Sequence, residues 1–184
     1  MTALAPGDVV AVRTGGWAAR LIRFGQALRG LPNLDNHIVI VHHLDAGGTL
    51  WGIEGRPGGM GWVNVNSYPI RYMIDNAEQP KTDAQRAVVC AELERMLGTR
   101  YDWEAIAEDS VGALGLGRLW HENWGGHGPP AHVVCSSAAS WLYGQVKLAR
   151  PGRTVDRLTM PGDWTAFDLS REWEHTTLFP KGAP

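Results

Sequence analysis

The spacing of apolar residues in the first half of the chain predicts a β-sheet. Residues 8–13 form a short apolar run after Pro6-Gly7, and residues 37–44, His-Ile-Val-Ile-Val-His-His-Leu, form the clearest strand of the sequence. A turn signal at residues 45–48 follows, so the chain is expected to return as a partner strand. The glycine-rich residues 55–61 are expected to form a flexible loop. Further strands are expected at residues 50–54, 62–65 and 71–74.

Helical spacing marks several further segments. Residues 82–97 give the clearest helix, with Thr82 as a candidate cap and Gly98 as its end. A second helical piece is expected over residues 101–111, and the chain after Arg150 is expected to be mostly irregular, with a turn at residues 160–164. Residues 17–29 predict an amphipathic helix with Arg20 and Arg23 towards one side. The apolar face of that helix carries Trp17, Leu21, Phe24 and Leu28.

Length and composition indicate one α+β globular domain spanning residues 1–184. A net charge of −2 without a dense basic block argues against nucleic acid as a partner. No stretch approaches about 18 consecutive apolar residues, so no stable membrane insertion is expected. The first residues lack a secretory signal pattern. A cytoplasmic location is therefore the default expectation, although delivery by a phage particle or a specialised secretion route would leave no mark in the sequence.

Cys135 lies where a loop becomes a helix, after Pro129-Pro130 and before a run of small residues. A thiol in the first turn of a helix is near unpaired backbone N–H groups and the positive end of the helix dipole. Both favour the thiolate, which is the form that attacks carbonyl carbons. Cys135 is therefore a candidate nucleophile, and the alternative interpretation is a small buried core residue. Cys90 lies within a helical pattern and is interpreted as core packing; a free thiol is the simpler interpretation of each cysteine than a disulfide.

A cysteine nucleophile needs a nearby base and a group that orients the base. His37 begins a strand, and the beginning of a strand presents its side chain at the rim of the sheet. The turn between the expected strands at residues 37–44 and 50–54 decides where Glu54 lies. If this turn has an even number of residues, His37 and Glu54 share a face and lie opposite or diagonal to each other. Glu54 could then fix the tautomer of the His37 ring, whereas an odd-length turn would send the two residues to opposite faces. The alternatives are a strand-edge histidine with a local hydrogen bond and a solvated glutamate.

These residues carry a resemblance to a known family. The chain resembles the circularly permuted NlpC-like papain-fold proteins of the YiiX-like group over residues 7–165, through motifs in the same order. In that family the histidine strand precedes the cysteine helix, the reverse of papain. The resemblance implies an α+β papain-like fold with an antiparallel sheet of about 4–6 strands and helices packed on it. The motifs are Gly7-Asp8-Val9-Val10, Asn36-His37-Ile38-Val39-Ile40-Val41, Ile53-Glu54, Tyr101-Asp102-Trp103, Val134-Cys135-Ser136-Ser137 and the closing turn Met160-Pro161-Gly162-Asp163.

The resemblance also implies an activity. Cys135 would be the nucleophile, His37 the base and Glu54 the polar third member, although family members often carry His, Asn or Gln at the third place. The implied reaction is a cofactor-independent amidase or peptidase reaction through an acyl-enzyme, with bacterial cell-wall peptides as the expected substrate. The alternative is a lipid or thioester acyl hydrolase or transferase of the same fold. Trp120 and Trp124 lie in a long loop that would stack on a sugar, hold an acyl chain or simply pack on the core.

Two other classes of function remain open at this level. A zinc site is suggested by five histidines, but no His-Glu-x-x-His helix is present, and adjacent His42 and His43 on a strand should point to opposite faces. A non-catalytic relative that binds a ligand or partner, such as a virion or toxin component, would have the same sequence pattern as an enzyme. The oligomeric state does not follow from the sequence. The five histidines are His42, His43, His121, His127 and His132.

Overall fold

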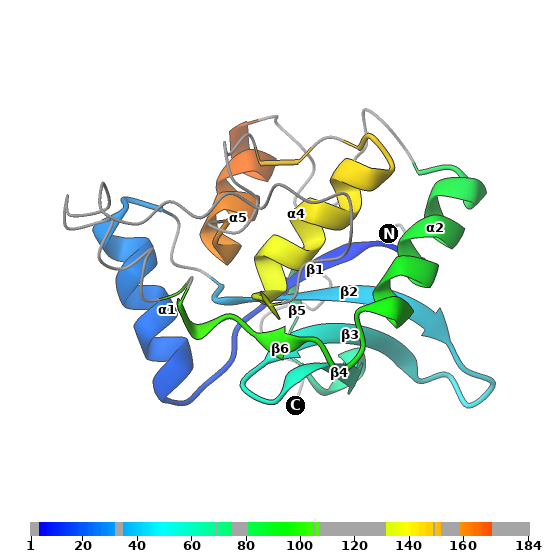
Figure 1. Ribbon diagram of the computed structural model, residues 1–184, viewed down its shortest axis with the longest axis horizontal. Coiled ribbons are helices and arrows are strands. Elements are labelled where there is room, and N and C mark those ends of the chain that lie inside the picture. Colours follow the sequence, from blue (N-terminus) through cyan, green and yellow to red (C-terminus); the bar gives the residue numbers. More distant parts are fainter. Residues whose placement is uncertain are drawn as a thin grey trace.

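The computed structural model describes residues 4–31, 35–68, 70–74, 81–104, 106, 132–148, 150–151 and 159–170. Within this part of the chain the architecture is α+β, as the sequence predicts (Figure 1). The strands are β1 (Val9–Val12), β2 (His37–Leu44), β3 (Leu50–Arg56), β4 (Gly59–Asn64), β5 (Ile70–Ile74), β6 (Arg100–Tyr101) and β7 (His132–Val133). The helices are α1 (Trp17–Leu28), α2 (Asp83–Arg95), α4 (Cys135–Gln145) and α5 (Pro161–Ser170), with a short 3₁₀ turn η1 at Val65–Ser67.

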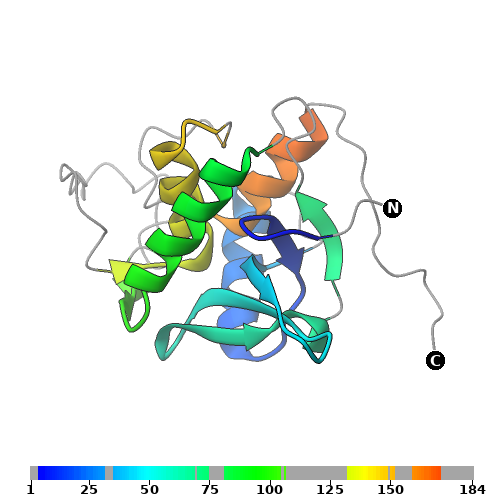
Figure 2. The ribbon, with the colours of Figure 1, turned by 90° about the vertical axis from the view of Figure 1, so that its right-hand side faces the viewer.

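Five strands form an antiparallel sheet in the order β4-β3-β2-β1-β5. Alternation along β2 sends Ile38 and Ile40 to one face and Val39 and Val41 to the other, where they join separate apolar clusters. Helices α2, α4 and α5 cover the first face, which also holds the buried Trp164 (Figures 1 and 2). The largest cluster of core residues therefore lies between the sheet and these three helices.

Helix α2 begins as the sequence predicts. Thr82 is its N-cap, and the Thr82 hydroxyl accepts a hydrogen bond from the backbone N–H of Gln85. The Gln85 side chain in turn accepts from the backbone N–H of Thr82, which completes a capping box.

Two predictions about connecting segments were wrong. Residues 55–61 do not form a flexible loop: β3 continues to Arg56, only Pro57-Gly58 form the turn, and β4 begins at Gly59, which pairs with Arg56. Gly59 has a φ of 105°, a conformation that glycine adopts without steric cost and that closes this tight hairpin. The expected turn at residues 160–164 is instead the beginning of α5, where the Asp163 carboxylate accepts the backbone N–H of Met160.

The β2–β3 hairpin contains a register shift that decides which side chains meet. At the tip of the hairpin, Leu44 pairs with Leu50 and His43 with Trp51. The positions in each pair add to an even number, so the turn between the two strands has an odd number of residues. The register shifts between Val41 and His43, so that Ile40 pairs with Ile53 and the positions add to an odd number. His37 and Glu54 each lie an odd number of residues from this last pair. They therefore share one face. The turn itself has an odd length, and the bulge at His42 produces the same-face arrangement that the sequence analysis expected from an even-length turn.

Candidate active site

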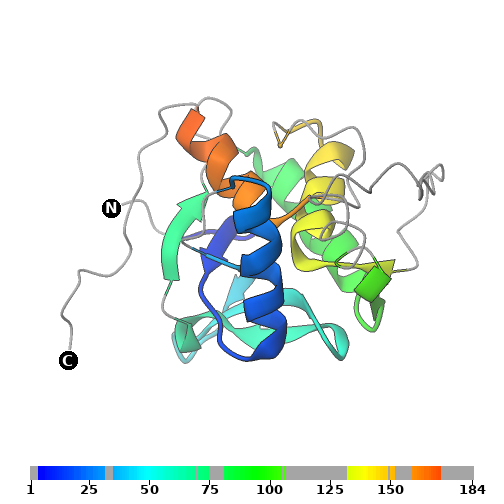
Figure 3. The same ribbon diagram turned by 90° about the vertical axis from the view of Figure 1, so that its left-hand side faces the viewer.

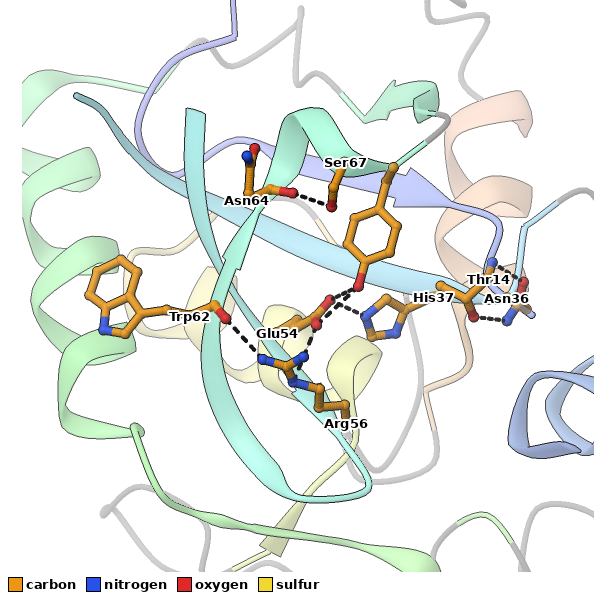
Figure 4. Close-up of polar contacts among 9 residues, drawn as sticks. Thr14, Asn36, His37, Glu54, Arg56, Trp62, Asn64 and Ser67 are labelled. Carbon is orange, nitrogen blue, oxygen red and sulfur yellow. Dashed lines mark hydrogen bonds and ion pairs between the residues drawn. The ribbon is translucent and has the colours of Figure 1, made fainter. Parts of the chain in front are cut away.

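Three side chains hold the beginning of β2, and with it His37, in place. Asn36 donates a hydrogen bond to the Thr14 hydroxyl at 2.7 Å and accepts one from the Thr14 backbone N–H at 2.9 Å (Figure 4). Gln26 of α1 donates to the backbone carbonyl of Asp35 at 2.9 Å, and Thr165 of α5 donates to the Asp35 carboxylate. The segment before His37 is thus tied to the residues that follow β1, to α1 and to α5.

Glu54 is buried on β3 and contacts His37 directly. Its Oε2 atom lies 2.7 Å from His37 Nε2, and its carboxylate accepts the Tyr68 hydroxyl at 3.0 and 3.1 Å. Arg56 Nε lies 3.5 Å from the other carboxylate oxygen, and Figure 4 shows the carboxylate between His37 and Arg56. These three partners satisfy the buried carboxylate, which can accept a hydrogen bond from a proton-bearing Nε2.

Cys135 is the first residue of α4, and this end of the helix is held by a local cap, by the preceding strand and by α5. The backbone N–H of Val134 donates to the Ser137 hydroxyl at 3.0 Å, and the preceding residues form the β7 strand, which pairs with β6. From the other side, Trp164 Nε1 of α5 donates to the Ser136 carbonyl at 3.1 Å. The small residues after Cys135, all buried, let this helix pack closely on the sheet: Ser136, Ser137, Ala138, Ala139 and Ser140.

Strand β3 approaches the beginning of α4 at Gly55. A Cβ atom at Gly55 would lie 3.1 Å from the Cys135 backbone nitrogen and 3.4 Å from its Cα. Glycine is therefore the residue that allows the strand carrying Glu54 to approach the helix carrying the thiol this closely.

His37 interacts with the Cys135 thiol as well as with Glu54. Because His37 is the first residue of β2, its ring lies at the rim of the sheet, where the beginning of α4 can reach it. Burial alone would lower the pKa of His37, but the neighbouring Cys135 side chain and the Glu54 carboxylate together raise this pKa above its usual value. Nε2 is engaged by Glu54, so Nδ1 is the ring nitrogen left for proton exchange with a thiol. The structure thus brings His37 into contact with Glu54, and Gly55, the neighbour of Glu54, packs on the backbone of Cys135.

A cleft of about 280 Å³ opens onto this group. Its lining includes His37, Glu54, Gly55 and Arg56 from the sheet together with aromatic rings from three other segments. The Cys135 side chain is only 3% exposed and does not line the cleft itself, whereas Gly55, which packs on the Cys135 backbone, does. The aromatic residues of the lining are Trp17, Tyr68 and Tyr101.

Sequence reasoning did not identify Tyr68, Arg56 or Gly55 as parts of the site. Tyr68 follows η1, far from any motif, and reaches Glu54 only because the chain after β4 turns back across the sheet. Burial and the Glu54 carboxylate raise the pKa of Tyr68, so its hydroxyl remains a donor at neutral pH. Arg56 and Gly55 fell in the stretch expected to be a loop. Strand alternation from Glu54 would have placed Arg56 on the same face.

The prediction that His42 and His43 point to opposite faces was wrong. The bulge at His42 interrupts the alternation, and the Nδ1 atoms of the two rings lie 3.0 Å apart. His42 also lies 3.1 Å from the Glu94 carboxylate, and both rings contact Trp62 edge-on. Within the described residues, no group of three or more His, Cys, Asp or Glu side chains is arranged to hold a metal ion. His121, His127, Trp120 and Trp124 lie outside the described residues.

Both cysteines are free thiols, as expected. Cys90 is half-buried on α2, with its sulfur 3.8 Å from the His42 carbonyl, and burial raises its pKa. It therefore offers an internal control for the reactivity of Cys135.

The chain matches no model of a known protein family and none of the curated proteins with which it was compared.

Proposed function

We propose that the protein is a cysteine hydrolase, an amidase or peptidase of the circularly permuted NlpC-like papain fold. Cys135 is the nucleophile, His37 the general base and acid, and Glu54 the residue that orients His37. The observation that carries this proposal is the contact of His37 Nε2 with Glu54 Oε2 at 2.7 Å, beside the place where Gly55 packs on the backbone of Cys135. This nucleophile, base and orienting group constitute the arrangement that covalent catalysis requires.

The reaction begins with proton transfer from the Cys135 thiol to His37 Nδ1. The thiolate attacks the carbonyl carbon of the substrate, and the carbonyl π electrons move to oxygen. The resulting oxyanion lies near the first turn of α4, where backbone N–H groups and the helix dipole favour negative charge. The Cys135 backbone N–H is the donor we assign to it.

Collapse of this intermediate breaks the bond to the leaving group. His37 gives its proton to the departing amine, and a thioester to Cys135 remains. Water then attacks the thioester carbon while His37 removes a proton from it. The second collapse expels the sulfur, which recovers its proton from His37, and releases the carboxylic acid. At each stage the negative charge of Glu54 stabilises the imidazolium form of His37.

The proposed substrates are bacterial cell-wall peptides. The test is to incubate the protein with purified muropeptides and with acyl esters and to analyse the products by mass spectrometry. We expect cleavage of an amide bond by the unmodified protein and by Cys90→Ser, and none by Cys135→Ala. Cleavage that persists in Cys135→Ala would overturn the proposal, as would a stable fold of the unmodified protein with no cleavage of either substrate class.

One observation favours a second candidate, a lipid or thioester acyl hydrolase. Trp17, whose side chain is 67% exposed, lines the cleft and begins a row of exposed apolar residues on α1. An acyl chain entering the cleft would meet this apolar surface. The same assay separates the two candidates, because this one predicts release of fatty acid from acyl esters and no change in the muropeptides.

A further inference from the structure

The apolar face of α1 points away from the core. Its buried residues are Ala19, Ile22, Gly25 and Gln26, whereas the large apolar side chains at helical spacing face solvent. We call these four side chains the α1 stripe. They are Trp17 (67% exposed), Leu21 (36%), Phe24 (58%) and Leu28 (37%).

This helix lies at the edge of the molecule opposite α2, and it faces the viewer in Figure 3. With 12 residues it is about 18 Å long, so the stripe runs along three turns. An apolar row of this length is much more than a single exposed side chain, and such rows mark interaction surfaces. None of the helices in the described part of the chain is both long and apolar enough to cross a bilayer.

The charged residues of α1 and of the segments that flank it in the sequence are all basic. Between Asp8 and Asp35 the sequence holds four arginines and no acidic residue, although the whole chain has a net charge of −2. Arg20 is exposed beside the stripe, and Arg13 and Arg23 are partly exposed. Among the residues that the structure describes, no carboxylate pairs with these three arginines. A helix with one apolar face and only basic charges beside it is the kind that lies in the interface of an anionic membrane.

We propose that α1 docks the protein on the surface of an anionic lipid bilayer. The stripe inserts among the acyl chains near the headgroups, and Arg20 and Arg23 contact lipid phosphates. Trp17, the first residue of α1, both lines the cleft and begins the stripe, so docking sets the mouth of the cleft against the membrane surface. Tryptophan is well suited to this position because its ring is amphipathic.

The test is co-sedimentation with vesicles of phosphatidylcholine containing phosphatidylglycerol and with vesicles of phosphatidylcholine alone. We expect binding to the anionic vesicles that weakens as salt is raised. Phe24→Asp should weaken it at least about tenfold and Arg20→Glu about fivefold. Leu44→Asp is the matched control, since Leu44 is an apolar side chain, 64% exposed, on the β2–β3 hairpin. It should bind within about twofold of the unmodified protein.

Three results would overturn this inference. They are an absence of binding to anionic vesicles, equal losses in Phe24→Asp and Leu44→Asp, and a dimer in light scattering that Phe24→Asp dissociates, which would assign the α1 stripe to a second copy of the chain. The inference does not depend on the thiol chemistry. Cys135→Ala should bind vesicles like the unmodified protein, so a failure of docking and a failure of the proposed catalysis are distinguishable.

Discussion

The ring of His37 meets the carboxylate of Glu54 at 2.7 Å because one bulge, at His42, shifts the register of the hairpin that carries both residues. Without this bulge the odd-length turn at the tip would send the two side chains to opposite faces of the sheet. The contact between His37 and Glu54 therefore depends on a bulge at His42, towards the other end of β2 from His37.

Glu54→Gln should slow the reaction of Cys135 with iodoacetamide near pH 6 by about tenfold, because the amide keeps a hydrogen-bond acceptor for His37 but loses the charge that favours the imidazolium. Glu54→Ala also loses the orientation of the ring and should slow it by about a hundredfold. The rates are measured by mass spectrometry of the modified protein.

The control for this pair of variants is Glu94→Gln. Glu94, on α2, makes a comparable contact with His42 of β2, away from the Cys135 thiol. It should leave the rate at Cys135 unchanged. A Glu54→Gln protein that reacts as fast as the unmodified one would show that Glu54 has no part in activating the thiol.

Gly55→Ala should reduce the reactivity of Cys135 by about tenfold or more. The added methyl would lie 3.1 Å from the Cys135 backbone nitrogen, so that the beginning of α4 must shift away from β3. Gly58→Ala, in the turn three residues after Gly55, adds a methyl that meets no atom within 4 Å and serves as the matched control. If both variants react alike, the close approach of β3 to α4 is irrelevant to the thiol.

Asp35→Asn should stabilise the fold in a pH-dependent way. Burial raises the pKa of Asp35 from 3.8 to about 6, despite the hydrogen bond from Thr165, so the ionised carboxylate weakens the folded state above this pH. The penalty disappears as the pH falls from about 6 towards the unfolded-state value of 3.8. Removing the charge should raise the free energy of unfolding by roughly 2–3 kcal/mol near pH 7 and by almost nothing near pH 4.

Urea denaturation at the two pH values measures this difference. An equal gain at both would show that ionisation of Asp35 is not its cause. A loss of stability near pH 7 would show that the carboxylate is favourable where it lies.

The sequence was sufficient for the elements with strong periodicity. The bounds of β2 agree with the predicted strand, because a run of β-branched apolar residues marks it. Helix α2 begins after Thr82, because its capping residues are local in sequence. The proximity of Cys135 to His37 was predictable only by resemblance, because about a hundred residues separate them and spacing says nothing at that range.

Features that depend on one residue or on tertiary contacts were missed. A bulge adds a single residue without a distinctive pattern, so the reorientation of His42 and His43 could not be read from alternation. The helical spacing of Trp17 and Phe24 predicted α1 correctly but could not tell that this face meets solvent. Tyr68 enters the site through the path of the chain after β4, which no local pattern records.

The most direct test of the central claim, that His37 activates Cys135, is the rate of thiol alkylation at both cysteines as a function of pH in the unmodified protein and in His37→Ala. The account predicts that Cys135 is modified rapidly and stoichiometrically at about pH 6 while Cys90 stays unmodified, and that His37→Ala slows Cys135 by about a hundredfold with no effect on Cys90. Two thiols that react equally slowly at that pH, or a Cys135 rate unchanged by the loss of His37, would contradict it.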